Sequence, residues 1–320
     1  MRWNLFALVV LLLLGSQLNG ASTFTPILID APAVNVIGAL STDGTNVYAY
    51  GQSTPDWSSR MMLKIDLSTG AVTTLSTGTA GPSTVIGSSL YWIDSNGGTS
   101  TGTIIKKVSL TGGSATVIYD GVPAGQPIMD GDSMVTDGSK LYISDDYAGG
   151  VFSMNPDGSG ITRIGANRYA TGFSNERNSS LAISGNTLYV SDGGKGTTPG
   201  TFDSLATAGG AYTHLYSTST AFEPDRMTVL DDNIYMLEHG RILVMSTAGG
   251  TPAVFATASD SHWAQPWGIT SYENTLYVSG LSASGAEGLW SITVPEPMSL
   301  SLLGLGTLVL LGRKTRRAGR

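Results

Sequence analysis

Short runs of β-branched, aromatic and aliphatic residues alternate along the chain with turns of glycine, asparagine and aspartate, a pattern that predicts β-hairpins. One stretch shows it clearly. Residues 227–230 form an apolar run, 231–233 a polar turn and 234–237 a second apolar run, and two further runs follow at 241–245 and 252–255. We therefore expect four consecutive antiparallel strands here, rather than helices.

The same unit recurs through the chain, and the second strand of each copy carries a tyrosine, namely Tyr48, Tyr91, Tyr142, Tyr189, Tyr235 and Tyr277. Successive tyrosines are separated by 43, 51, 47, 46 and 42 residues. Repeats with a period in the forties, each read as four strands, are typical of propeller blades. The sequence thus predicts an all-β fold, a six-bladed β-propeller.

The sixth copy lacks its fourth strand, because the chain leaves the repeat after the third strand at 288–292. A segment that resembles a fourth strand stands instead near the N-terminus, where residues 25–29 are similar to residues 251–255. A propeller must hide the edges of its first and last blades, and one blade shared between both ends does so. We therefore expect residues 24–29 to complete the sixth blade and close the ring.

Residues 90–94, Leu-Tyr-Trp-Ile-Asp, resemble the YWTD repeat of six-bladed propellers, with isoleucine in place of threonine, and the whole core is similar to that superfamily or to the related NHL type. The resemblance implies that the tyrosines pack between blades. It also implies that the aspartates hold neighbouring strands together by hydrogen bonds, and these are Asp94, Asp145 and Asp192. A role as metal ligands is the alternative for the aspartates.

The two ends of the chain are expected to lie outside the propeller, which leaves residues 22–293 for the fold. Residues 1–21 combine Arg2 with a pure apolar run and small residues for cleavage, as a secretory signal does. Residues 294–320 begin with Val294, Pro295, Glu296 and Pro297, continue with an apolar run and end in five basic residues. This order resembles a PEP-CTERM sorting signal. The resemblance implies transient anchoring in the inner membrane by a short transmembrane helix, processing by an exosortase, and delivery to the cell surface or the extracellular matrix.

Composition and charge exclude some classes of function. The chain contains no cysteine, so neither disulfides nor thiolate chemistry contribute. Residues 22–297 carry 11 basic and 24 acidic residues, a net charge of −13. Such a surface repels a phosphate backbone, and nucleic-acid binding is therefore not expected.

The loops that lead into the innermost strands surround the axis of a propeller, and binding residues collect on such loops. The predicted ligand-binding residues at this channel mouth are Glu176, Arg177, Asp225, Arg226, His262, Trp263 and Trp267. The tryptophans are suited to stack on a sugar, or else plug the ring. Four carboxylates in the same loops are suited to hold Ca²⁺, or else are simply solvated, namely Asp132, Glu176, Glu223 and Asp225.

We expect no serine-nucleophile site, because the histidines His214, His239 and His262 lie in three different contexts and no Gly-x-Ser-x-Gly motif occurs. His262, close to a predicted channel loop, is the one candidate base. The favoured function is an exported, noncatalytic binding or scaffold module without a cofactor, whose partner is an exopolysaccharide or a matrix protein. The alternative is a Ca²⁺-dependent lactonase- or phytase-like hydrolase with its site at the channel mouth.

Overall fold

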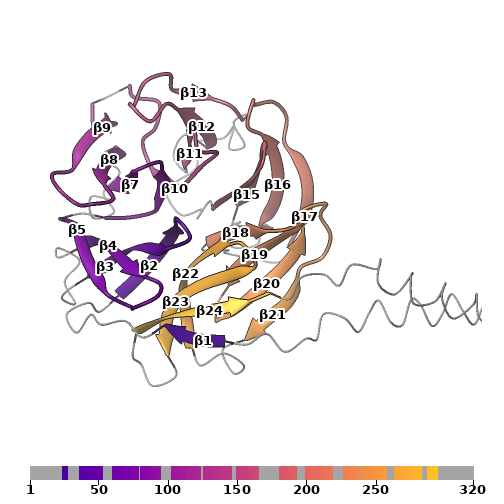
Figure 1. Cartoon of the computed structure of the whole chain (residues 1–320). Coiled ribbons are helices and arrows are strands. Elements are labelled where there is room, and N and C mark those ends of the chain that lie inside the picture. Colours follow the sequence, from indigo (N-terminus) through magenta and orange to yellow (C-terminus); the bar gives the residue numbers. More distant parts are fainter. Residues whose placement is uncertain are drawn as a thin grey trace, which may run out of the picture.

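The computed structural model shows six four-stranded antiparallel sheets arranged as blades around a central axis (Figure 1). It describes residues 24–27, 36–52, 60–78, 80–94, 102–123, 125–145, 149–165, 180–192, 199–218, 226–238, 240–257, 263–282 and 287–294. All regular elements in these ranges are strands. The predicted fold class, an all-β six-bladed propeller, is confirmed.

The first three blades follow one another in the chain, and each runs from an innermost to an outermost strand. Blade 1 consists of β2 (Val36–Thr42), β3 (Asn46–Gln52), β4 (Arg60–Asp66) and β5 (Val72–Thr77). Blade 2 consists of β6 (Ser83–Ile86), β7 (Ser89–Asp94), β8 (Ile104–Ser109) and β9 (Thr116–Asp120). Blade 3 consists of β10 (Gly131–Thr136), β11 (Leu141–Asp145), β12 (Gly150–Met154) and the two-residue β13 (Thr162–Arg163).

Blades 4 and 5 repeat this order, whereas the sixth blade combines strands from both ends of the chain. Blade 4 consists of β14 (Leu181–Ser184), β15 (Thr187–Asp192), β16 (Thr201–Ala206) and β17 (Thr213–Ser217). Blade 5 consists of β18 (Arg226–Leu230), β19 (Asn233–Glu238), β20 (Arg241–Ser246) and β21 (Ala253–Thr257). Blade 6 consists of β22 (Trp263–Tyr272), β23 (Thr275–Ser282), β24 (Glu287–Thr293) and β1 (Phe24–Ile27).

The N-terminal strand β1 forms the outer edge of blade 6. It pairs antiparallel with β24, from Phe24 opposite Ile292 to Ile27 opposite Leu289. After β24, the amide of Val294 donates a 2.8 Å hydrogen bond to the carbonyl of Asn274. Residues 1–23 and 295–320, which include the predicted signal, Pro295, Glu296, Pro297 and the predicted membrane segment, lie outside the described residues. No helix suited to cross a membrane is found in the described ranges.

The apolar core lies between the blades, where side chains of one sheet pack on the next. At the junction of blades 1 and 2, Tyr48 and Met62 pack in one cluster with Trp92, and all three are fully buried. The repeat tyrosines are buried in five blades, at Tyr48, Tyr91, Tyr142, Tyr189 and Tyr235, and Tyr277 is partly buried against another cluster. The expectation that these rings pack between blades is therefore confirmed.

A β-bulge recurs where the third and fourth strands of a blade pair. In blades 1, 2, 4 and 5 the register shifts at the same point, between Met62 and Leu63, Ile105 and Lys106, Phe202 and Asp203, and Ile242 and Leu243. A bulge places one extra residue on the outer strand and changes which side chains share a face. In blade 4 this local geometry builds a polar site, described below.

Candidate functional site

The six innermost strands, β2, β6, β10, β14, β18 and β22, surround an axial channel with a cavity of about 300 Å³. Hydroxyl groups are prominent in its lining, from Ser41, Ser83, Thr84, Ser133, Thr136, Ser180, Thr228, Thr270 and Ser271. Aliphatic residues such as Leu40 and Met134 complete the wall. Because a hydroxyl both donates and accepts hydrogen bonds, such a wall suits a polar ligand or ordered water.

Some channel hydroxyls connect neighbouring blades. Ser41 Oγ and Ser83 Oγ lie 3.0 Å apart across blades 1 and 2, and Thr228 Oγ1 and Ser271 Oγ lie 2.8 Å apart across blades 5 and 6. Ser133 Oγ accepts a 3.1 Å hydrogen bond from the first amide of β14. These contacts link the inner strands at the junctions of blades 1 and 2, 3 and 4, and 5 and 6.

The term upper face is used for the face of the propeller at which the second strand of each blade ends and the innermost strand begins. Buried carboxylates occupy one position on this face, three residues after the repeat tyrosine, in blades 2 to 5: Asp94, Asp145, Asp192 and Glu238. Asp145 Oδ2 accepts hydrogen bonds from the amides of Met129 and Asp130, at 2.5 and 2.9 Å. Asp94 forms a 2.5 Å ion pair with Lys106 on the adjacent strand. The expected structural role is therefore seen for these two aspartates.

Asp130, Asp132 and Asp145 form an acidic group around the start of β10. Burial raises the pKa of Asp130 to about 6, and the negative charges of Asp132 and Asp145 add to this effect. Asp145 is engaged by backbone amides, and groups of three or more His, Asp or Glu side chains suited to hold a metal ion are not found within the described ranges. Of the four predicted calcium ligands, Asp132 alone is described, and Glu176, Glu223 and Asp225 lie outside the described residues.

Arg226 is the predicted ligand-binding residue that the structure brings to the channel. It begins β18 and therefore contributes to the cavity wall at its upper end. Trp267 is partly buried at a bulge of β22, and it is not among the residues that line the cavity. Trp263 begins the same strand, opposite Ser282. The remaining predicted residues, Glu176, Arg177, Asp225 and His262, lie outside the described residues.

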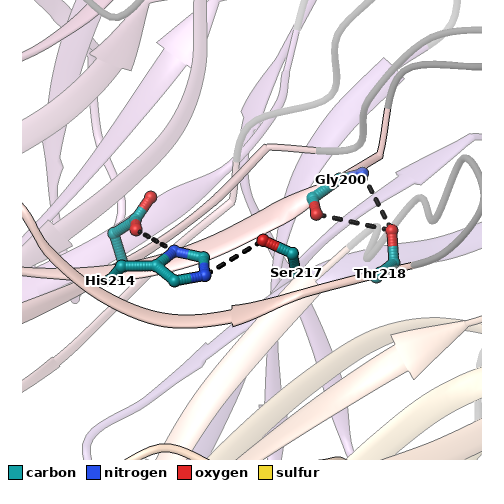
Figure 2. A network of polar contacts seen from close by, with 5 residues as sticks. Gly200, His214, Ser217 and Thr218 are labelled. Carbon is teal, nitrogen blue, oxygen red and sulfur yellow. Dashed lines mark hydrogen bonds and ion pairs between the residues drawn. The ribbon is translucent and has the colours of Figure 1, made fainter.

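A site that we did not expect from the sequence lies on blade 4. His214 Nδ1 is 2.9 Å from Asp203 Oδ1, and His214 Nε2 is 3.0 Å from Ser217 Oγ. Figure 2 shows the imidazole between the serine hydroxyl and the carboxylate. Asp203 is 5% exposed, whereas Ser217 is exposed and the His214 side chain is 55% exposed. A carboxylate, an imidazole and a hydroxyl in this order form the arrangement that activates a serine nucleophile.

The bulge explains why sequence reasoning missed this group. Residues three apart on a regular strand point to opposite faces, so His214 and Ser217 would be separated. The extra residue of the bulge, Leu215, brings both side chains to one face, and Asp203 lies opposite His214 on β16. A buried aspartate in the third strand, together with a histidine on the fourth, was the available signal.

Comparison with known proteins shows the fold. No family description and no curated protein matches the chain. A protein from Thermus thermophilus, provisionally described as an oxidoreductase (glucose dehydrogenase), is 16% identical, with a TM-score of 0.56 over 85% of this chain and 99% of its own. The β-propeller domain of the Trilobed protease from Pyrococcus furiosus, described as having an open velcro topology, is 11% identical, with a TM-score of 0.50 over 80% of this chain and 94% of its own. This chain is a β-propeller. At such low identity the likeness concerns the fold alone.

Proposed function

We propose that the protein is an exported propeller that binds a glycan or a protein partner of the extracellular matrix at the upper mouth of its axial channel, without catalysis at that mouth. One observation carries this proposal: a cavity of about 300 Å³, lined by serine and threonine hydroxyls, with Arg226 at its upper end. Hydroxyls and a guanidinium are the groups that recognise the hydroxyl and carboxylate substituents of sugars.

The surrounding fold supports a binding role. In blades 1 to 5 the turns between the first and second strands, and between the third and fourth, lie at the lower face. The second strands end and the innermost strands begin at the upper face, so the connections from these ends start there. Binding residues are common on the loops that connect the strands of such a scaffold. Asp145, one of the buried carboxylates of the upper face, holds the amides of Met129 and Asp130 in the connection before β10.

A glycan array followed by titration of the best ligand tests the proposal. Arg226→Ala should weaken binding about tenfold or more, because it removes charge-assisted hydrogen bonds. Arg163→Ala is the matched control, since Arg163 is exposed on the outer strand β13 and its removal changes the net charge equally. Equal affinity of the two variants for that ligand would argue against the channel mouth.

The calcium-dependent alternative is tested separately. A bound Ca²⁺ stabilises the folded state by mass action, so its removal lowers the melting temperature. Under the binding proposal, EDTA leaves both the melting temperature and glycan binding unchanged. A fall in either property on chelation, reversed by added Ca²⁺, would favour the calcium-dependent hydrolase instead.

We also infer that residues 1–21 direct export through the inner membrane, and that residues 294–320 are a PEP-CTERM signal removed by an exosortase. The order of the Val294–Pro297 motif, an apolar run and a basic tail supports this inference. Processing at residue 21 leaves β1 close to the new N-terminus, in place to close blade 6. Mass spectrometry of the chain from the host envelope and medium should find both ends removed, and Glu296→Ala should retain the tail.

A further inference from the structure

We propose that Asp203, His214 and Ser217 form a second functional site, a serine-nucleophile site that cleaves small acyl esters on the outer wall of blade 4. The site lies on β16 and β17, the two strands of this blade farthest from the channel. It is therefore separate from the channel mouth, and the activity goes beyond the binding function proposed above.

Comparison of the blades shows how unusual the residue choice is. At the register position of Asp203 the other blades carry Leu63, Lys106, Phe152, Leu243 and Trp290. At the position of His214 they carry Thr74, Val117, Arg163, Val254 and Pro26. Blade 4 thus places a 5% exposed carboxylate where a leucine suits the fold, at Leu63 and Leu243. Burial of a carboxylate is costly, and stability alone does not account for the choice.

The strand that carries the nucleophile is held on both sides. Thr218 Oγ1 accepts a 2.8 Å hydrogen bond from the amide of Gly200 and donates to the carbonyl of Gly200 at 3.4 Å (Figure 2). The amide of Thr218 also donates to this carbonyl, at 3.0 Å. On the opposite edge, Gly249 of the blade 5 turn packs against the carbonyl of Leu215. The bulge and Ser217 therefore keep one geometry, as a preorganised site requires.

The polar contacts fit the tautomer that nucleophilic catalysis needs. An ionised Asp203 accepts hydrogen bonds only, so Nδ1 of His214 carries the proton and donates to it. Nε2 of the neutral ring is then an acceptor, and the hydroxyl of Ser217 donates to it. Asp203 acts as a positioning residue, which holds the tautomer and orientation of the ring.

The reaction follows in two balanced steps. Ser217 Oγ forms a bond to the carbonyl carbon of the ester while its proton moves to His214 Nε2, and that proton then passes to the departing alkoxide, which leaves as an alcohol. Water next attacks the acyl-serine, gives its proton to His214 Nε2 and releases the carboxylic acid. The proton returns to Ser217 Oγ, and the net reaction is ester plus water to acid plus alcohol.

The exposure of the site selects the substrate class. Ser217 and His214 both face solvent, so water supplies much of the stabilisation of the developing oxyanion. Stabilisation by water is weaker than stabilisation by a buried oxyanion hole. Amides need stronger stabilisation than activated esters. A small acyl ester, such as an acetate ester whose alcohol leaves readily, is the substrate that this geometry fits.

Two measurements on the full-length chain test the proposal. A fluorophosphonate probe, followed by peptide mapping, should modify Ser217, and hydrolysis of p-nitrophenyl acetate should fall about 100-fold in Ser217→Ala and His214→Gln. Asp203→Asn should reduce both labelling and hydrolysis, with binding at the channel mouth unchanged. Thr77→Ala is the matched control, because Thr77 occupies the position of Ser217 in blade 1.

The outcomes are distinct. Ser217 labelling that is lost in His214→Gln and kept in Thr77→Ala supports the site. Absence of labelling, or equal ester hydrolysis by the parent chain and Ser217→Ala, overturns it. Ser217 and His214 are exposed, so these two variants should fold and keep the test valid even where Asp203→Asn does not.

Discussion

The phenol of Tyr142 donates a 2.7 Å hydrogen bond to Asp137 Oδ2, across the turn that joins β10 to β11. Tyr48 and Asp43 form the same contact at 2.7 Å in blade 1, again five residues apart. Burial raises the pKa of Tyr142 to about 12, and the hydrogen bond and charge of Asp137 add to this effect. The repeat tyrosine is thus an anchor for its own turn as well as a packing residue between blades.

Tyr142→Phe should lower the free energy of unfolding by about 1 kcal/mol, because it removes one charge-assisted hydrogen bond and leaves the ring packing intact. Urea denaturation measures this loss. Tyr235→Phe is the control, since the residue five positions before Tyr235 is Leu230 and no hydrogen bond of the Tyr235 hydroxyl is found in the described part of the chain. A loss as large in the control would show that the phenol acts through something other than the turn.

The same turn predicts an acid-dependent loss of stability. Burial acts to raise the pKa of Asp137, but hydrogen bonds from the Lys140 amide, Tyr142 and Ser139 outweigh it and lower the pKa to about 2, from an ordinary 3.8. Between these values the unfolded chain binds more protons than the native one, so the stabilisation is complete above about pH 4 and is lost as the pH falls through about 2. Asp137→Asn should flatten the melting temperature profile between pH 2 and 4. An unchanged slope would contradict this assignment.

The architecture could be predicted from the sequence because it depends on local sequence patterns. Alternating apolar runs, Gly/Asn/Asp turns and the spacing of the tyrosines each depend on residues close in the chain. The predicted strand at 241–245, for example, agrees with β20 (Arg241–Ser246) within one residue. Six repeats reinforce one another, so an error in one unit does not change the fold.

The blade 4 site could not be predicted because it depends on pairing details. Asp203 and His214 become neighbours through the register of β16 and β17, and Ser217 joins them only through the bulge at Leu215. The sequence shows three separate polar residues there. Arg226, by contrast, was found because the start of an innermost strand always reaches the axis of a propeller.

We expect the protein to lose stability as the pH rises, because of Glu287. Burial raises its pKa from an ordinary 4.5 to about 7, and its Oε2 is buried without a hydrogen bond to any described residue. The native state therefore binds more protons between these values, and stability falls as the pH rises from about 4.5 through 7. Glu287→Gln should raise the melting temperature at pH 8 by about 2–4 °C and leave it nearly unchanged at pH 4. Glu273→Gln, at an exposed turn, should show no such difference.

Closure of the ring by β1 is tested by truncation. A chain that begins at residue 28 lacks β1 and leaves Leu289 and Trp290 on an open strand edge, whereas both are buried in the complete fold. Compared with a chain that begins at residue 22, it should melt at a lower temperature and associate at high concentration, because unpaired edges recruit other strands. A synthetic peptide of residues 24–29 should partly restore the melting temperature. Identical melting of the two chains would show that β1 does not close the ring.

The blade 4 site can be separated from a purely structural network by replacing it with the apolar pair of blade 5. Asp203→Leu with His214→Val copies Leu243 and Val254, which occupy the same register positions. Asp203 is buried whereas His214 is exposed, and replacement of a buried charge together with its partner by apolar residues is often neutral or stabilising by about 1–4 kcal/mol. We therefore expect the double variant to unfold at an equal or higher urea concentration, and to lose ester hydrolysis and probe labelling at Ser217. Ser217→Ala should lose the same activity with unchanged stability, because that residue is exposed. If the double variant were instead less stable by more than about 2 kcal/mol, the three residues would be retained for folding, since a loss of that size is what removal of a needed buried network causes.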